Sequence, residues 1–153
     1  MVAFSNSRSI HVAAPPEVVG ALVDDLRAWQ RWSPWEGVDP QLERTYTGPE
    51  RGVGSRYAWR GNKKAGTGSM EVTTSTPEEV TLALAFVAPI KAENTVTLGF
   101  VPEADGTTVT WTMSGERNRL MAAAGALFFD KALGKDVDRG LASLKREAEA
   151  DAA

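Results

Sequence analysis

Few residues in this chain have the chemistry of a catalytic or metal-binding group. There is no cysteine and only one histidine, His11, which excludes disulfides, thiolate metal sites, cysteine nucleophiles and a cage of several histidines. His11 alternates with Ile10 and Val12, so we expect its side chain to point to solvent. No Gly-x-Ser-x-Gly motif accompanies it, which disfavours a hydrolase triad. We assign no catalytic residue and no metal site, and we expect no cofactor.

Acid–base chemistry by carboxylates would require Asp or Glu on a buried face. Glu71 and Glu93 both alternate with the apolar residues of their predicted strands, so their side chains are expected to face solvent. The glycine pairs Gly52-x-Gly54 and Gly66-x-Gly68 lack the Lys-Ser/Thr that follows in a phosphate-binding loop, and are better read as bends in a curved sheet. The residues therefore favour a protein without catalytic activity.

Large and flexible apolar side chains are the informative feature. In strand-like segments they alternate with polar residues, so one face of each strand is apolar. Aromatic rings and methionines suit an irregular ligand pocket, although they can equally fill a core. With Trp32, Trp35 and Asn94, discussed next, the ligand-binding candidates are Trp32, Trp35, Tyr57, Trp59, Met70, Phe86, Asn94, Trp111, Met113, Met121 and Phe128.

Three of the less obvious candidates have competing interpretations. Trp29, Trp32 and Trp35 recur every third residue; Trp32 is expected chiefly in the core, and Trp35, after Pro34, at a portal to the cavity. Asn94 is expected on the same face of its strand as the apolar residues. An unpaired amide buried on that face would cost about 1–3 kcal/mol. It would either contact a ligand or form a hydrogen bond with nearby backbone.

The elements that carry these residues follow a simple order. Alternation at Arg8–Val12 predicts a first strand, and Pro16 with the apolar residues that follow predicts a helix to about Asp24 or Asp25. A second helical turn carries Trp29 and Trp32. Six further strands are expected between turn signals, at Arg44–Tyr46, Gly54–Arg60, Gly66–Thr74, Val80–Val87, Ala92–Val101 and Thr107–Ser114. Short connections make neighbouring strands antiparallel.

The last third of the chain predicts a long helix. Residues from Leu120 to Ala150 contain no proline and carry one apolar stripe. Glycines at positions 125 and 134 leave open whether the helix is broken there. A sheet with one apolar face and a helix to cover it give an α+β fold.

Short sequence motifs along nearly the whole chain resemble those of the START-like (SRPBCC) superfamily, specifically its bacterial polyketide cyclase/dehydrase and lipid-transport branch. They are Ala14-Pro15-Pro16-Glu17-Val18-Val19, Trp32-Ser33-Pro34-Trp35, Gly48-Pro49-Glu50-Arg51-Gly52-Val53-Gly54, Trp59-Arg60-Gly61-Asn62-Lys63-Lys64 and Gly140-Leu141-Ala142-Ser143-Leu144-Lys145. The resemblance implies a helix-grip fold, in which a curved seven-stranded antiparallel sheet wraps the C-terminal helix around an apolar cavity.

The same resemblance implies three functions. The first is binding or transport of a hydrophobic or amphipathic small molecule, such as a lipid, sterol or polyketide, in the cavity between sheet and helix. The second is a polyketide cyclase or dehydratase. The third is a protein-interaction module akin to the co-chaperones of the superfamily. No catalytic motif is shared across the branch, so none is transferred to this chain.

Composition limits the partners and the location. The 153 residues suit one domain over 1–153. A net charge of −3 argues against nucleic acid, which requires a basic surface. No apolar run reaches the ~18–20 residues of a membrane span, and no signal peptide is evident. We therefore expect a cytoplasmic protein, monomeric or homodimeric, whose partner is a hydrophobic small molecule.

Overall fold

A strand, two short helical segments, six further strands and a long helix follow one another, as the sequence predicts. The computed structural model describes the backbone of residues 2–88, 91–117 and 119–153 and the side chains of residues 3–88, 91–116 and 134–153. The elements are β1 (Val2–Val12), α1 (Pro16–Val23), the 3-10 helix η1 (Ala28–Arg31), β2 (Glu43–Thr47), β3 (Arg56–Arg60), β4 (Thr67–Ser75), β5 (Glu79–Ala88), β6 (Ala92–Glu103), β7 (Gly106–Arg117) and α2 (Arg119–Ala152).

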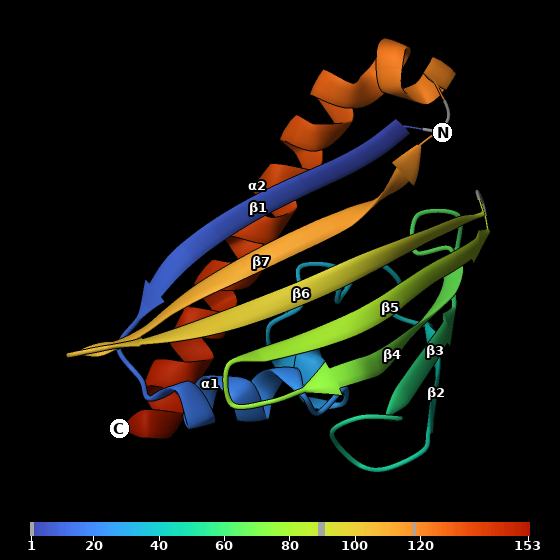
Figure 1. Ribbon diagram of the computed structural model, residues 1–153. Helices are drawn as coiled ribbons and strands as arrows, with labels where there is room; N and C mark the ends of the chain where they lie inside the picture. Colours follow the sequence, from blue (N-terminus) through green and yellow to red (C-terminus); the bar gives the residue numbers. More distant parts are fainter. Residues whose placement is uncertain (1, 89–90, 118) are drawn as a thin grey trace.

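The seven strands form one curved antiparallel sheet in the order β1-β7-β6-β5-β4-β3-β2 (Figure 1). Strands that follow one another from β2 to β7 are neighbours, and β1 joins β7 at the far edge. The α+β fold with a seven-stranded antiparallel sheet is therefore confirmed. β1 begins at Val2 rather than at Arg8, because it pairs with β7 from Val2 opposite Arg117 to Val12 opposite Thr107.

One face of the sheet, called here the inner face, carries the apolar side chains. Val72, Leu82 and Leu98 on this face are fully buried, whereas the intervening Thr73 and Ala83 are exposed. The alternation predicted for β4, β5 and β6 is therefore confirmed. Burying such side chains is the main driving force for the fold, at about 25 cal/mol per Å² of apolar area.

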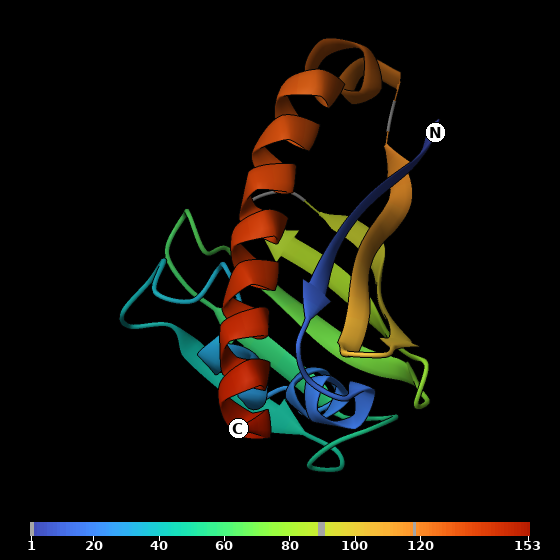
Figure 2. The ribbon, with the colours of Figure 1, turned by 90° about the vertical axis from the view of Figure 1, so that its left-hand side faces the viewer.

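The C-terminal helix α2 lies along the inner face next to β1, and it also contacts β7, α1 and η1 (Figure 2). It runs from Arg119 to Ala152 as one helix, so the glycines at 125 and 134 do not interrupt it. Val137, Leu141, Leu144 and Ala148 of this helix are buried. Within the described residues, no helix combines the length and apolar character needed to cross a bilayer.

Candidate functional site

A row of side chains crosses the inner face from β2 to β6. Residues opposite each other on neighbouring strands share a face of the sheet. The strand register places Tyr46, Tyr57, Met70, Leu84 and Asn94 opposite one another in that order. We call these five residues the inner row. Three predicted ligand-binding residues, Tyr57, Met70 and Asn94, therefore lie in one continuous strip.

Aromatic stacking extends the inner row to its neighbours. The ring of Tyr57 stacks between Tyr46, with centroids 5.1 Å apart, and Trp59, with centroids 5.7 Å apart. The edge of Trp59 then meets Phe86 at 5.7 Å. Such pairs contribute about 0.5–1.5 kcal/mol each beyond area burial. Trp59 and Phe86, also predicted site residues, therefore join the same surface.

Trp59 is held by the turn that precedes β4. It lies opposite Gly68, where a Cβ atom would come within 2.7 Å of the indole Cζ2. Its Nε1 donates a hydrogen bond to the carbonyl oxygen of Ala65 at 3.0 Å. The register with β5 shifts between Thr67 and Gly68, which confirms the bend predicted at Gly66-x-Gly68. Glycine at position 68 thus leaves free the space that the Trp59 indole occupies.

A charged pair lies beside the stacked tyrosines. The Arg44 guanidinium donates a hydrogen bond to the Glu36 carboxylate, and the two side chains are 26% and 23% exposed. Arg44 Nε is buried and has no hydrogen-bond partner among the described residues. Burial and the nearby Glu36 charge raise the pKa of Tyr57 to about 12, against the opposing effect of Arg44. The Tyr57 hydroxyl therefore stays protonated at neutral pH, as a hydrogen-bond donor.

Sequence reasoning missed both members of this pair. Arg44 is two residues before Tyr46 in a short strand, so the sequence could have placed the two side chains on the same face. Glu36 lies in the loop after η1, where no periodicity assigns a direction. The expectation that no carboxylate lies near the inner face holds for Glu93, which is exposed, but it overlooked Glu36.

A second aromatic cluster lies where η1 meets the sheet. The Trp29 and Trp32 rings are 4.4 Å apart, and the Trp111 ring of β7 is 6.2 Å from Trp32. Trp32 is 2% exposed and its Nε1 donates to the Leu22 carbonyl at 2.8 Å, so it is a core residue. Trp35 contacts Trp111 at 5.8 Å and remains 38% exposed, in keeping with a position at the rim.

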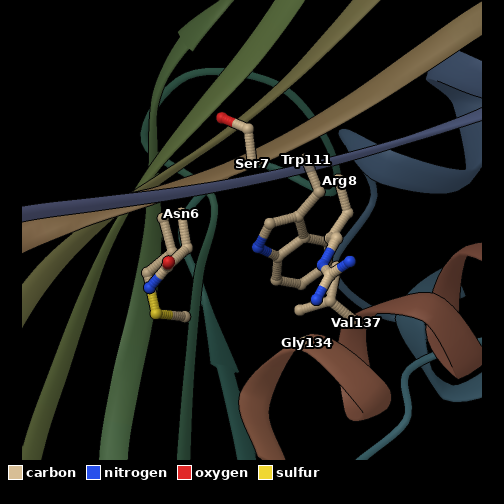
Figure 3. Close-up of a pocket in the computed structure, with 7 residues that line it drawn as sticks. Asn6, Ser7, Arg8, Trp111, Gly134 and Val137 are labelled. Atoms are coloured by element: carbon tan, nitrogen blue, oxygen red, sulfur yellow. The ribbon is translucent and has the colours of Figure 1, made fainter. Parts of the chain in front are cut away.

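A pocket of about 130 Å³ opens between β1, β7 and α2 (Figure 3). Trp111 and Met113, two predicted site residues, line it together with Arg8 of β1 and Val137 of α2. Met113 is 7% exposed. The sequence did not indicate Arg8 as a lining residue.

The other predicted site residues are placed as follows. Asn94 is half-buried and its Oδ1 lies against Gly115, at 2.5 Å from where a Cβ atom would stand. Met121 and Phe128 lie outside the residues whose side chains the structure describes. The predicted residues whose side chains the structure describes thus fall into two groups, one around the inner row and one around Trp111.

His11 points to solvent, as predicted. Its Nδ1 lies 3.7 Å from Glu103 and its Nε2 3.5 Å from Asp105. These three exposed side chains could offer ligand atoms within 4.8 Å of one another. The same distances suit ion pairs of a protonated histidine, and we assign no metal to them.

Comparison with solved structures supports the fold. The chain superposes on half of the di-domain ARO/CYC BexL from the BE-7585A biosynthetic pathway, with a TM-score of 0.73 at 18% identity, covering 97% of this chain and 50% of that one. The di-domain ARO/CYC StfQ from the steffimycin pathway gives a TM-score of 0.69 at 12% identity, covering 99% and 51%. SA2116 from Staphylococcus aureus, a protein of unknown function, gives 0.73 at 11% identity, covering 97% and 95%.

At these identities the structural matches establish the fold alone. No curated protein matches the chain. The model of the family described as polyketide cyclase / dehydrase and lipid transport matches residues 3–149. Because that match spans almost every element from β1 to α2, the chain belongs to the polyketide cyclase / dehydrase and lipid transport family.

Proposed function

We propose that this protein binds a hydrophobic or amphipathic small molecule, such as a lipid, sterol or polyketide, between the inner face of the sheet and the C-terminal helix. The observation that carries the proposal is the inner row, which mixes rings, a thioether and an amide on one strip. Membership of a family that includes lipid transport supports it.

The chemistry of the inner row suits such a ligand. Burial of apolar ligand surface would contribute about 25 cal/mol per Å². The unbranched side chain of Met70 adapts to irregular shapes. The hydroxyls of Tyr46 and Tyr57 and the amide of Asn94 would orient polar groups of the ligand, since pockets of this kind hold a few polar groups among many apolar ones.

Native mass spectrometry and fluorescence titration with fatty acids, sterols and aromatic polyketides test the proposal. Leu84→Phe adds bulk to the inner row and should weaken binding by about tenfold or more, equivalent to about 1.4 kcal/mol. Ala83→Phe is the matched control, because Ala83 is the preceding residue on the exposed outer face. A panel in which nothing binds more tightly than millimolar would contradict the proposal.

A second candidate function is polyketide cyclisation or dehydration. It is favoured by the charged pair Arg44–Glu36 beside Tyr57. A protonated phenol can donate a hydrogen bond to a substrate carbonyl, and a guanidinium can stabilise the negative charge that develops on that oxygen. Two structural neighbours are ARO/CYC proteins by their descriptions.

The cyclase hypothesis makes a distinct prediction for one hydroxyl. Tyr57→Phe retains the stacked ring and removes the donor, so turnover of a poly-β-keto substrate should be abolished while binding changes little. Tyr46→Phe removes the neighbouring hydroxyl and shows whether the loss of turnover is specific to Tyr57. Equal turnover in wild-type protein and Tyr57→Phe would rule out this role for Tyr57.

A further inference from the structure

The indole N–H of Trp111 is a buried hydrogen-bond donor. Trp111 is 2% exposed, and its Nε1 has no hydrogen-bond partner among the described residues. The indoles of Trp29, Trp32 and Trp59 behave differently, since each donates to a backbone carbonyl at 2.7–3.0 Å. Leaving a buried donor unpaired costs about 1–3 kcal/mol. An acceptor supplied from outside the chain would remove that cost.

This donor faces the pocket between β1 and α2. The pocket is lined by Asn6 and Arg8 of β1, Trp111 and Met113 of β7, and Gly134 and Val137 of α2. Figure 3 shows the indole nitrogen on the side of the ring that faces Asn6, beneath β1 and across from α2. An acceptor atom entering here from the edge of the sheet would meet the N–H directly.

Arg8 supplies a positive charge at the same opening. A Cβ atom at Gly134 would come within 2.2 Å of its Nη2 and 3.0 Å of its Cζ, so the guanidinium lies against the bare backbone of α2. Glycine inside a helix costs up to ~1 kcal/mol relative to alanine, and here it leaves room for this cation. The Arg8 side chain is 48% exposed, and among the described side chains it has an ionic contact with Asp138 at 3.9 Å.

We infer that this pocket is a subsite for the carboxylate of an amphipathic ligand, with Trp111 Nε1–H and the Arg8 guanidinium as its two donors. A guanidinium stays charged at all ordinary pH values and matches the geometry of a carboxylate. The inference rests on the proposed function, because the apolar remainder of the ligand would occupy the inner face.

The size of the pocket limits what enters it. Pockets that hold whole ligands measure about 300–1,000 Å³, whereas this pocket measures about 130 Å³. A carboxylate fits such a volume, and a lipid chain or a fused ring system does not. The negative charge of Asp138 at the mouth of the pocket repels an anion. Its 3.9 Å contact with Arg8 must therefore break when the ligand binds.

Calorimetric titration with dodecanoate and dodecanol tests the inference, because the two amphiphiles differ in the charged group. Dodecanoate should bind about tenfold or more tightly than dodecanol at neutral pH. Arg8→Gln and Gly134→Ala should each abolish that advantage, the second by pushing the guanidinium off α2. Arg56→Gln, on the exposed outer face of β3, is the matched control and should keep it.

The Trp111 indole signal gives an independent readout. In a ¹H–¹⁵N spectrum its resonance, assigned with Trp111→Phe, should shift on addition of dodecanoate and much less with dodecanol. If Trp111→Phe fails to fold, Arg8→Gln and Gly134→Ala carry the test, because the Arg8 side chain is 48% exposed and a helix favours alanine over glycine. Equal affinities for the two amphiphiles, or an advantage that survives Arg8→Gln, would overturn the inference and leave the proposed function standing.

Failure of the proposed function gives a different result. If neither amphiphile binds, propionate at millimolar concentration replaces them. A shift of the Trp111 indole that is lost in Arg8→Gln would then support a site for small carboxylates alone. If the indole responds to propionate equally in the wild-type protein and in Arg8→Gln, the carboxylate subsite is overturned as well. The same holds if it responds to neither dodecanoate nor propionate.

Discussion

Pro34 packs against α2 at Gly140 so closely that a Cβ atom at position 140 would lie 2.7 Å from the proline Cδ. A hydrogen bond of 3.0 Å from Arg139 Nη2 to the Pro34 carbonyl oxygen reinforces the contact. Together they attach the segment that carries Trp32 and Trp35 to the C-terminal helix. The two tryptophans are thereby fixed relative to both layers.

This contact predicts opposite effects for alanine at two glycines of the same helix. Gly140→Ala gains up to ~1 kcal/mol of helix propensity but forces the rigid proline ring away, at about 1–3 kcal/mol, so the melting temperature should fall. At Gly134 the obstacle is the mobile end of Arg8, and Gly134→Ala should be neutral or stabilising. Thermal unfolding by circular dichroism measures both, and an equal rise in the two variants would show that Pro34 does not constrain the helix.

The indole of Trp32 should matter far more for stability than that of Trp35. Trp32→Phe removes the 2.8 Å hydrogen bond to Leu22 and leaves that carbonyl unpaired, at a cost of about 2–4 kcal/mol with the lost packing. Trp35 is 38% exposed, so Trp35→Phe should cost less than about 1 kcal/mol. Urea denaturation compares them. Comparable losses would mean that Trp35 belongs to the core rather than to the rim.

The alternation of residues was sufficient to place most of the fold and half of the site. Alternation along each strand assigned Tyr57, Trp59 and Met70 to one face, because adjacent side chains of a strand point in opposite directions. Trp32 is a core residue, as expected, and Trp35, expected at a portal, is 38% exposed. These inferences depend only on local geometry, which the sequence encodes directly.

What the sequence could not supply depends on distances between segments. Glu36 lies in a loop, and its place beside Arg44 is fixed by how η1 meets β2. That the N–H of Trp111 meets no acceptor in the described part of the chain emerges only when the neighbouring acceptors are located. The start of β1 was placed too late because pairing with β7, rather than alternation within the segment, extends it to Val2.

Neutralising Glu36 should destabilise the protein through Arg44. In Glu36→Gln the guanidinium of Arg44, whose side chain is only 26% exposed, loses its ionic partner, and the free energy of unfolding should fall by about 1–3 kcal/mol. The control is Glu43→Gln, because the Arg60–Glu43 pair is 73% and 68% exposed. Surface pairs of that kind contribute about 0–1 kcal/mol. Chemical denaturation that finds no difference between the variants would contradict a structural role for the Arg44–Glu36 pair.

Burial of Tyr57 predicts a loss of stability at alkaline pH. The pKa of an unfolded tyrosine is about 10, and burial raises the pKa of Tyr57 to about 12. Between these values the unfolded chain releases a proton that the folded chain keeps, so the stability contributed by the neutral phenol is complete below about pH 10 and is lost as the pH rises toward 12. The difference amounts to about 2–3 kcal/mol.

Denaturation at about pH 9 and about pH 11.5 measures this loss. Tyr57→Phe should lose less stability than the wild-type protein over the same interval, because a phenyl ring has no proton to release. Tyr46→Phe keeps Tyr57 and should retain the part of the loss that Tyr57 contributes, although burial raises the pKa of Tyr46 as well. If the wild-type protein and Tyr57→Phe weaken by the same amount, the hydroxyl of Tyr57 ionises as it does in water and is not buried as the inner row requires.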